Sequence, residues 1–252
     1  MTSWNAGAVY SASWLHKRGY SYPLLSQYRQ AGWLAGIGSG ALVRCGDKVE
    51  WTGGVYALQE QLNLKIHVAG KTALALQGSA HFLGLGRSTV SLYGTKGQKL
   101  PAWFAKHEWN TEVRYVSSNL FGDDSQSGMT KYDAGNFTVK MSAPERAILE
   151  VLHLVPEEES FEQARLLLQG LTTLRPDLVH KLLVACTSIK VRRLFMALSE
   201  ELELPWTKKV DFDSIDIGKG ARYLLKGGKT HPKYQITLPL DCFAPAPKRS
   251  IR

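Results

Sequence analysis

The stretch Ser21-Tyr-Pro-Leu-Leu-Ser-Gln-Tyr-Arg-Gln-Ala-Gly-Trp-Leu-Ala-Gly-Ile-Gly-Ser-Gly-Ala-Leu-Val-Arg44 decides the fold of the N-terminal part of the chain. Ser21 is a favourable N-cap, and Pro23 fits the first turn of the helix that follows. Gly32 is typical of a residue that ends a helix. Apolar residues recur at helical spacing between these limits, at Leu24, Leu25, Tyr28 and Ala31. The polar residues therefore face outward, at Ser26, Gln27, Arg29 and Gln30.

A shorter helix is predicted directly before this one. Ser11 is its expected N-cap, Trp14 and Leu15 lie on its inner side, and it runs through Arg18 to end at Gly19. Two short helices separated by a tight turn that contains glycine form a helix-turn-helix pattern.

A β-hairpin is predicted directly after the second helix. Residues 33–37 and 41–44 flank Gly38-Ser39-Gly40, whose glycines permit the positive φ angles of a hairpin loop. A glycine-rich phosphate-binding loop is the alternative, but the helix with Lys-Ser/Thr that such a loop requires does not follow. A hairpin in this place is the wing of a winged helix-turn-helix.

The second helix of a winged helix enters the major groove, and the wing contacts the backbone or the minor groove. Arg and Gln read base edges through paired hydrogen bonds, whereas Ser and Tyr more often hold phosphate. A winged helix that serves only protein contacts is the alternative. The expected DNA contacts are Lys17, Arg18, Ser21, Tyr22, Ser26, Gln27, Arg29, Ser39 and Arg44.

The charge distribution favours a polyanionic partner near the N-terminus. The 252 residues carry a net charge of +9, and residues 1–90 hold eight Lys/Arg against three acidic residues. A basic bias in the part that carries the helix-turn-helix is typical of DNA binding, although a simple solubility bias is the alternative.

The composition excludes several other classes of protein. No stretch approaches the roughly 18 apolar residues of a membrane span, and residues 1–5 do not begin a signal peptide. Cys45, Cys186 and Cys242 are an odd number in no metal-ligand spacing, which predicts reduced thiols in the cytoplasm, two of them in the core. No cofactor is indicated.

The segment after the wing predicts helices at 55–64 and 71–83 around a short extended piece at His67-Val68. Gly70-Lys71-Thr72 resembles the end of a phosphate-binding P-loop, but Lys65 stands where that loop needs glycine. We therefore expect Gly70 to begin a helix and Thr72 to cap it. The glycine-rich residues 84–98 predict a domain boundary near residue 90.

The rest of the chain predicts a mixed α/β domain, so the fold class is α+β. Strands are expected at 112–117, 136–141, 221–225 and 234–239, and a loop is expected at 122–128. Amphipathic helices are expected at 144–154, 160–171, 176–186 and 189–202, with a capping box at Ser160 and Gln163. The predicted domains are thus 1–90 and 91–243, followed by a basic, proline-rich tail at 244–252.

Catalytic patterns are scarce, and we do not expect an enzyme. Glu145 and Glu150 are candidates for an acid–base pair, but they diverge on a helix, and Arg146 pairs with Glu150 at i, i+4. We interpret them as a solvated helix face. No paired His or Cys motif indicates a metal. A second basic group is either ordinary helix surface or a patch for nucleic acid or a partner, at Lys181, Lys190, Arg192 and Arg193.

Longer strings carry a resemblance to a known family. They are 24–34 and 37–44, Trp51-Thr-Gly-Gly-Val-Tyr-Ala-Leu-Gln59, His67-Val-Ala-Gly-Lys-Thr-Ala-Leu74, Ser142-Ala-Pro-Glu-Arg-Ala-Ile-Leu-Glu150, Ser188-Ile-Lys-Val-Arg-Arg-Leu-Phe195 and Lys233-Tyr-Gln-Ile-Thr237. Across nearly its whole length the chain resembles the AbiEi family of type IV antitoxins.

The resemblance implies an antitoxin that binds inverted repeats in its own promoter through the winged helix and represses the operon. It also implies that the C-terminal domain counteracts a nucleotidyltransferase toxin without a stable complex. A further helical segment ahead of the helix-turn-helix is usual in the family, whereas residues 1–10, with Gly7, predict only a weak helix. The alternatives are a nucleic-acid-processing enzyme and an interaction module that grips the toxin directly.

Overall fold

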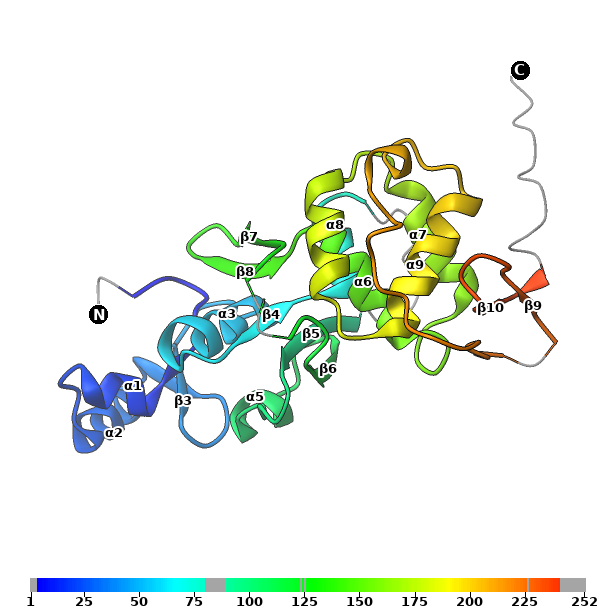
Figure 1. Ribbon diagram of the computed structural model, residues 1–252. Helices are drawn as coiled ribbons and strands as arrows, with labels where there is room; N and C mark the ends of the chain where they lie inside the picture. Colours follow the sequence, from blue (N-terminus) through cyan, green and yellow to red (C-terminus); the bar gives the residue numbers. More distant parts are fainter. Residues whose placement is uncertain (1–3, 80–88, 123, 125, 226, 241–252) are drawn as a thin grey trace, which may run out of the picture. The chain divides into compact units, whose positions relative to one another are not determined.

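The computed structural model describes residues 4–79, 89–122, 124, 126–225 and 227–240, and it divides into two compact units. Unit 1 holds the described residues within 1–76, 81–119 and 129–143. Unit 2 holds those within 77–80, 120–128 and 144–252. Both units are drawn in Figure 1.

Unit 1 begins with the winged helix-turn-helix. Its elements are β1 (Tyr10–Ser11), α1 (Ala12–Lys17), α2 (Tyr22–Gln30), β2 (Leu34–Gly36) and β3 (Ala41–Arg44). The strands form an antiparallel sheet in the order β1-β3-β2, so β3 lies in the middle. Both predicted helices and the hairpin are therefore confirmed, and residues 4–9 form no helix.

The core of the winged helix comes from the residues that helical spacing selects. Leu15, Leu25, Leu34 and Leu42 are buried together with Trp4 and Tyr10. Ser21 accepts a hydrogen bond from the Leu24 amide, as expected of an N-cap. Ser11 does not cap α1, because its hydroxyl pairs with Ser13 instead. The prediction that Ala31 faces inward is also wrong, since Ala31 is exposed at the end of α2.

A mixed sheet completes unit 1. Its order is β6-β5-β4-β8-β7, formed by β4 (Ile66–Val68), β5 (Thr89–Thr95), β6 (Glu112–Ser118), β7 (Met129–Asp133) and β8 (Thr138–Ser142). α3 (Trp51–Tyr56) continues into a π-helical turn at Ala57–Gln61, whose buried Gln59 amide bonds to Ile66 and Lys140 of two neighbouring strands. α4 (Gly70–Leu76) and α5 (Ala102–Lys106) are short.

The division into units differs from the predicted boundary near residue 90. β5 covers 89–95 and pairs with both β4 and β6, so the sheet joins residues on both sides of that boundary. Val90, Leu92 and Tyr93 are buried in this strand. The glycines of 84–98 indicated a loop there. The strand is formed by pairing with distant residues, which a local pattern does not show. Residues 80–88 lie outside the described part of the chain.

Two smaller expectations, one in each unit, are wrong. Thr72 does not cap α4, since its hydroxyl donates to the Thr89 carbonyl and accepts from the Ser91 amide, which ties α4 to β5. The predicted strand at 221–225 is reduced to one bridge between Arg222 and Ile236, while β9 (Lys229–Thr230) pairs with β10 (Thr237–Leu238). The predicted tail at 244–252 lies outside the described residues.

Unit 2 is mainly helical. α6 (Pro144–Leu154), α7 (Phe161–Gly170), α8 (Pro176–Ala185) and α9 (Ile189–Glu201) confirm the predicted helices. The hydroxyl of Ser160 accepts from the Gln163 amide, as its capping role requires. Phe195 of α9 stacks on Trp206, whose indole nitrogen donates to the Leu171 carbonyl. No helix among the described residues is long and apolar enough to cross a membrane.

The interpretation of Glu145 and Glu150 as a solvated helix face is wrong. Glu150 is fully buried, and Arg146, which pairs with it at 3.0 Å, is buried as well. Arg146 also donates to the Ser127 carbonyl and lies over the Phe121 ring. The i, i+4 pair is therefore confirmed, but it lies inside the fold, where Arg146 connects Phe121 and Ser127 to α6.

Substitution of Glu150 should destabilise unit 2 strongly. Glu150→Gln leaves the buried Arg146 guanidinium without its counter-charge, and breaking such a pair costs about 3–5 kcal/mol. Urea unfolding followed by circular dichroism measures this loss. Glu157→Gln, at a carboxylate that is 73% exposed, is the control and should cost less than about 1 kcal/mol. Equal losses in the two variants would contradict the buried pair.

Glu145 is buried against Arg175, and its ionisation should make stability depend on pH. Burial raises the pKa of Glu145, but hydrogen bonds from the Arg175 side chain and amide lower it by more, so the pKa lies below the ordinary 4.5. The stabilisation is thus present above pH 4.5 and is lost as the pH falls through the lower, folded-state pKa. We expect the difference in unfolding free energy between the wild type and Glu145→Gln to shrink below pH 4.5. A constant difference from pH 7 to pH 3 would contradict this.

The cysteine prediction holds only in part. Cys186 is buried and unpaired with another cysteine, and burial raises the pKa of its thiol. Cys45 is exposed at the base of the wing. Two core cysteines were expected, and among the described residues Cys186 is the one that is buried. Cys242 lies outside them.

Candidate nucleic-acid interface

The outward side of α2 presents two adjacent stripes of polar side chains. Tyr22, Ser26 and Arg29 are spaced by four and three residues, so they share one face of the helix. Gln27 and Gln30 lie on the neighbouring face. All five side chains are exposed. Leu25 is the residue of this helix that is buried in the core.

The first stripe faces the wing across a groove of about 240 Å³. Tyr22, Ser26 and Arg29 form the helix side of this groove, and Ser39 with its flanking glycines forms the wing side. Arg29 lies against Gly36, since a Cβ on this glycine would be 3.6 Å from Nη2 of Arg29. The absent side chain at residue 36 therefore leaves room for the guanidinium beside the wing backbone.

The tip of the wing is held in place by its glycines and by α5. Gly38 and Gly40 have φ angles of 82° and 88°, which confirms the predicted loop geometry. A Cβ on Gly38 would also be 3.2 Å from the Trp103 Cα, so the wing approaches α5 closely. Ser39 is exposed at this tip. Reasoning from sequence did not find Trp103, because α5 was not predicted and lies far from the wing along the chain.

The first turn of α2 is braced from α1. His16 stacks on Tyr22 with ring centroids 4.7 Å apart and an interplanar angle of 13°. Tyr22 nevertheless remains 55% exposed. Ser21 is exposed beside it, but its hydroxyl already accepts the capping hydrogen bond. His16 is thus a supporting residue that sequence reasoning missed. The signal that could have found it is its place in the last turn of α1, close to the start of α2.

The remaining basic residues of the predicted interface lie apart from the groove. Lys17 is exposed at the end of α1, and the Arg18 guanidinium carbon lies 4.0 Å from the centroid of the Trp14 ring. Arg44 donates to the Trp4 carbonyl and lies 3.9 Å from Asp47. Because Arg44 pairs with Leu34 at the base of the hairpin, it is distant from the wing tip and helps to hold the segment before β1.

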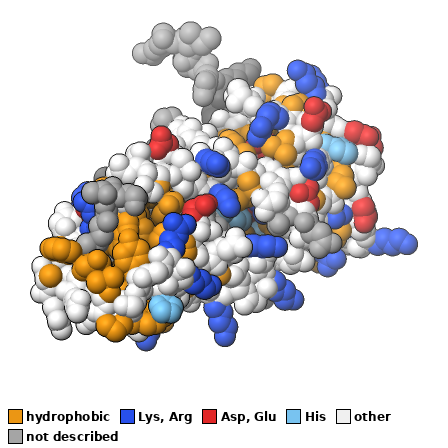
Figure 2. Space-filling view, turned by 90° about the vertical axis from the view of Figure 1, so that its left-hand side faces the viewer, with side chains coloured by type: hydrophobic (Ala, Val, Ile, Leu, Met, Phe, Trp, Pro, Cys, Tyr) orange, Lys and Arg blue, Asp and Glu red, His pale blue; other side chains and the backbone are white. Residues whose placement is uncertain are grey.

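Basic residues outnumber acidic ones at this end of unit 1. The sequence contains no acidic residue before Asp47, while Lys17, Arg18, Arg29 and Arg44 lie within the same stretch. Figure 2, which faces the end that carries α1 and α2, shows hydrophobic side chains gathered there with Lys and Arg around them. Such a surface attracts a polyanion over distances comparable to the Debye length.

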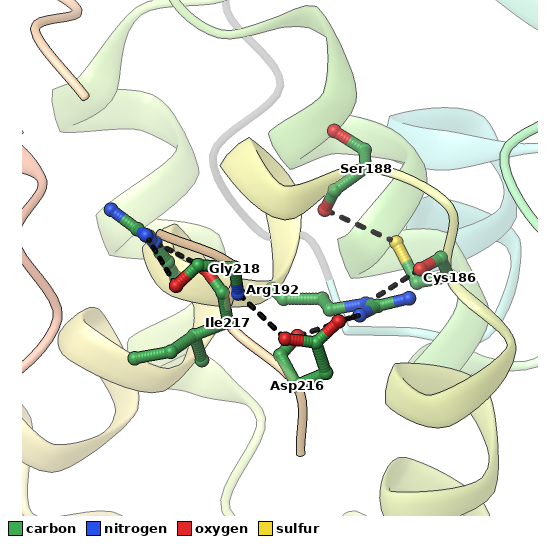
Figure 3. Close-up of polar contacts among 7 residues, drawn as sticks. Cys186, Ser188, Arg192, Asp216, Ile217 and Gly218 are labelled. Carbon is green, nitrogen blue, oxygen red and sulfur yellow. Dashed lines mark hydrogen bonds and ion pairs between the residues drawn. The ribbon is translucent and has the colours of Figure 1, made fainter. Parts of the chain in front are cut away.

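The second predicted basic group does not form a surface patch. Arg193 is 1% exposed and donates to the carbonyls of Ile217, Gly218, Gly220 and Gln235. Arg192 is also largely buried and bonds to the carbonyls of Cys186 and Asp216, as Figure 3 shows.

The two lysines of this group differ from each other. Lys190 donates to the carbonyls of His153 and Val155, near the end of α6. Lys181 alone is well exposed, at 62%, and it lies 3.6 Å from Asp124. Three of the four cations therefore serve the fold of unit 2 by donating hydrogen bonds to backbone carbonyl groups. Among the described residues, no group of His, Cys, Asp and Glu is arranged to hold a metal ion.

Comparison with known proteins gives one consistent family. Residues 1–85 match the family model described as the AbiEi antitoxin N-terminal domain of a transcriptional regulator. Residues 87–239 match the model described as transcriptional regulator, AbiEi antitoxin, type IV toxin–antitoxin system. A search of curated proteins finds no significant match.

A solved structure has the same fold. It is the RV2827C protein from Mycobacterium tuberculosis, at 13% identity and a TM-score of 0.55, with 91% of this chain and 85% of that chain covered. At this identity the likeness concerns the fold alone.

Proposed function

Because the chain belongs to the AbiEi family of transcriptional regulators, the antitoxins of type IV toxin–antitoxin systems, we propose that it represses its own operon by binding inverted repeats in the promoter. Two copies would bind, one on each repeat, with α2 of each in the major groove. The observation that carries this proposal is the groove between α2 and the wing, where Tyr22, Ser26, Arg29 and Ser39 converge on an acid-free surface.

The side chains of α2 and the wing divide the work of recognition by their chemistry. Arg29 and Gln27 carry side chains that form paired hydrogen bonds with guanine and adenine edges, respectively. Tyr22, Ser26 and Ser39 supply hydroxyls for the phosphates that border the groove. Lys17 and Arg18 follow as backbone contacts at the end of α1. Arg44 contributes less than its place in the sequence predicted, because its guanidinium is engaged with Trp4 and Asp47.

We propose that residues 91–243 form the domain that opposes the toxin. Residues 1–90 would bind DNA, and residues 244–252 would form a basic tail. The two family models meet between residues 85 and 87 and support a division of the sequence near residue 90, whereas the compact units of the structure divide the chain differently. The resemblance to the family supports a nucleotidyltransferase toxin as the functional partner, countered without a stable complex. An interaction module that grips the toxin is the rival, and it would yield a complex that survives purification.

An enzymatic role built on Glu145 and Glu150 has little support. Glu150 is fully buried against Arg146, and both carboxylate oxygens of Glu145 bind Arg175. Neither side chain is available to exchange protons with a substrate. We therefore propose a regulator rather than a catalyst.

The experiment that tests the proposal is a gel-shift titration of the full chain on its own upstream DNA. A scrambled duplex of the same length is the control, and both are titrated at two salt concentrations. Specific retardation of the upstream duplex supports autorepression. Equal, salt-sensitive binding to both duplexes would mean that the basic surface binds DNA without recognising the promoter, and the proposal would fail.

A further inference from the structure

A second hollow in unit 1 lies beside the helix-turn-helix and is not part of the groove described above. Its volume is about 480 Å³, within the roughly 300–1,000 Å³ of small-molecule sites. Trp4 and Tyr10 contact each other at 4.2 Å between ring centroids, and Trp14 and Tyr20 pack on them from α1 and the turn that follows. The hollow is lined by five aromatic rings, those of Trp4, Tyr10, Trp14, Tyr20 and Tyr56.

The polar groups in this hollow are few and carry no negative charge. Arg18 lies at its edge with the guanidinium over the Trp14 ring, and Asn5 bonds through its side chain to the Tyr56 hydroxyl. Burial raises the pKa of Tyr10 to about 12, so this phenol is neutral at physiological pH. No carboxylate is among the lining residues. The site therefore combines flat apolar walls with one cation.

We propose that this hollow binds a nucleotide, with the base against the half-buried rings of Trp14, Tyr20 and Tyr56 and the phosphate on Arg18. Stacking of a base on aromatic side chains favours binding and tolerates every base, because each base has a flat face. The planar guanidinium of arginine suits phosphate through paired hydrogen bonds. A quaternary ammonium ligand, which aromatic cages also bind, is disfavoured because Arg18 already places a cation over the ring that such a ligand would use.

The position of the hollow links its occupant to the DNA-reading helix. Arg18 is the C-cap of α1, and Tyr20 immediately precedes Ser21, the N-cap of α2. A bound nucleotide would therefore contact the turn that fixes the angle between the two helices. The nucleotide has two possible sources with the same chemistry, a free nucleotide of the cell or a nucleotide of the bound DNA.

The test is a fluorescence titration of the full chain with AMP, GMP, CMP and UMP. Trp4 and Trp14 line the hollow and are two of the seven tryptophans, so occupancy should quench part of the emission in a saturable way. Arg18→Gln should weaken binding of the monophosphates at least tenfold. Lys48→Gln, at a lysine that is 88% exposed and does not line the hollow, is the control and should leave the affinity for the monophosphates unchanged. Nucleosides should bind more weakly than monophosphates, and inorganic phosphate alone should not quench.

A competition with duplex DNA separates the two sources. If the monophosphate still binds when the protein is saturated with duplex, the ligand is a free nucleotide; if duplex displaces it, the site holds a nucleotide of the DNA. Absence of saturable quenching by all four monophosphates would overturn the proposal, and so would equal affinities of the Arg18→Gln and Lys48→Gln variants. Because promoter binding is measured separately by gel shift, failure here leaves the proposed function untouched.

Discussion

Arg29→Ala is expected to abolish specific binding to the promoter while the fold stays intact. One good bidentate contact with a base discriminates by about 1–3 kcal/mol, and a pair of inverted repeats counts the loss twice. The affinity for the upstream duplex should therefore fall by at least roughly 30-fold. Arg29 is exposed and rests on Gly36, so its removal should leave the free energy of unfolding within about 0.5 kcal/mol of the wild-type value.

The control for this variant is another basic residue of unit 1 that lies outside the groove. Lys48 is 88% exposed and paired with Glu50, so Lys48→Ala should change promoter affinity by less than about threefold. Gel shifts at two salt concentrations on the upstream and scrambled duplexes compare the variants. If Arg29→Ala lowered affinity for both duplexes equally, Arg29 would be a phosphate contact, and base recognition would pass to Gln27. Unchanged promoter affinity would remove Arg29 from the interface.

Local signals in the sequence predicted most of the winged helix. The capping of α2 by Ser21 and the glycine-flanked loop at Ser39 are determined by neighbouring residues, so they are legible without the rest of the fold. The helices of unit 2 were predicted for the same reason, because their apolar periodicity extends over ten or more residues.

The parts that were missed depend on distant pairing. β5 is buried along most of its length, so it lacks the alternation that marks a half-exposed strand, and its partners β4 and β6 are separated from it by loops. The prediction that Tyr22, Ser26, Arg29 and Ser39 belong to one DNA-binding site stays a prediction, although the structure brings them to one groove. That Arg29 rests on Gly36 required the three-dimensional position of the wing.

Charged residues gave the least reliable signals. Arg146 and Glu150 have the spacing of an exposed helix pair, and Lys190, Arg192 and Arg193 have the density of a basic patch, yet most of these side chains are buried. The reason is that segments without regular structure expose carbonyl groups that need donors, and arginine supplies several from one side chain. A sequence shows the cation but not the carbonyl groups that surround it.

Arg193→Met is therefore expected to be among the most destabilising substitutions in unit 2. Its guanidinium donates to the carbonyls of Ile217, Gly218, Gly220 and Gln235, which hold the segment after α9 in place. Methionine fills much of the volume but donates none of these hydrogen bonds, and a hydrogen bond from a charged donor contributes about 1.5–3 kcal/mol. We expect a loss of about 4 kcal/mol or more, which lowers the melting temperature by roughly 8–16 °C in a domain of this size.

The matched control comes from the same predicted patch. Lys181 is 62% exposed with a single partner, so Lys181→Met should change the melting temperature by only about 1–2 °C. Arg193→Lys keeps the charge but cannot reach four carbonyls at once, and it should fall between the two. This order of melting temperatures separates a structural arginine from a surface cation. If the patch only bound a partner, the three variants would have equal melting temperatures and would differ in binding. If Arg193→Met melted with the wild type, the carbonyl-binding role would be wrong, and the patch would return as a binding surface.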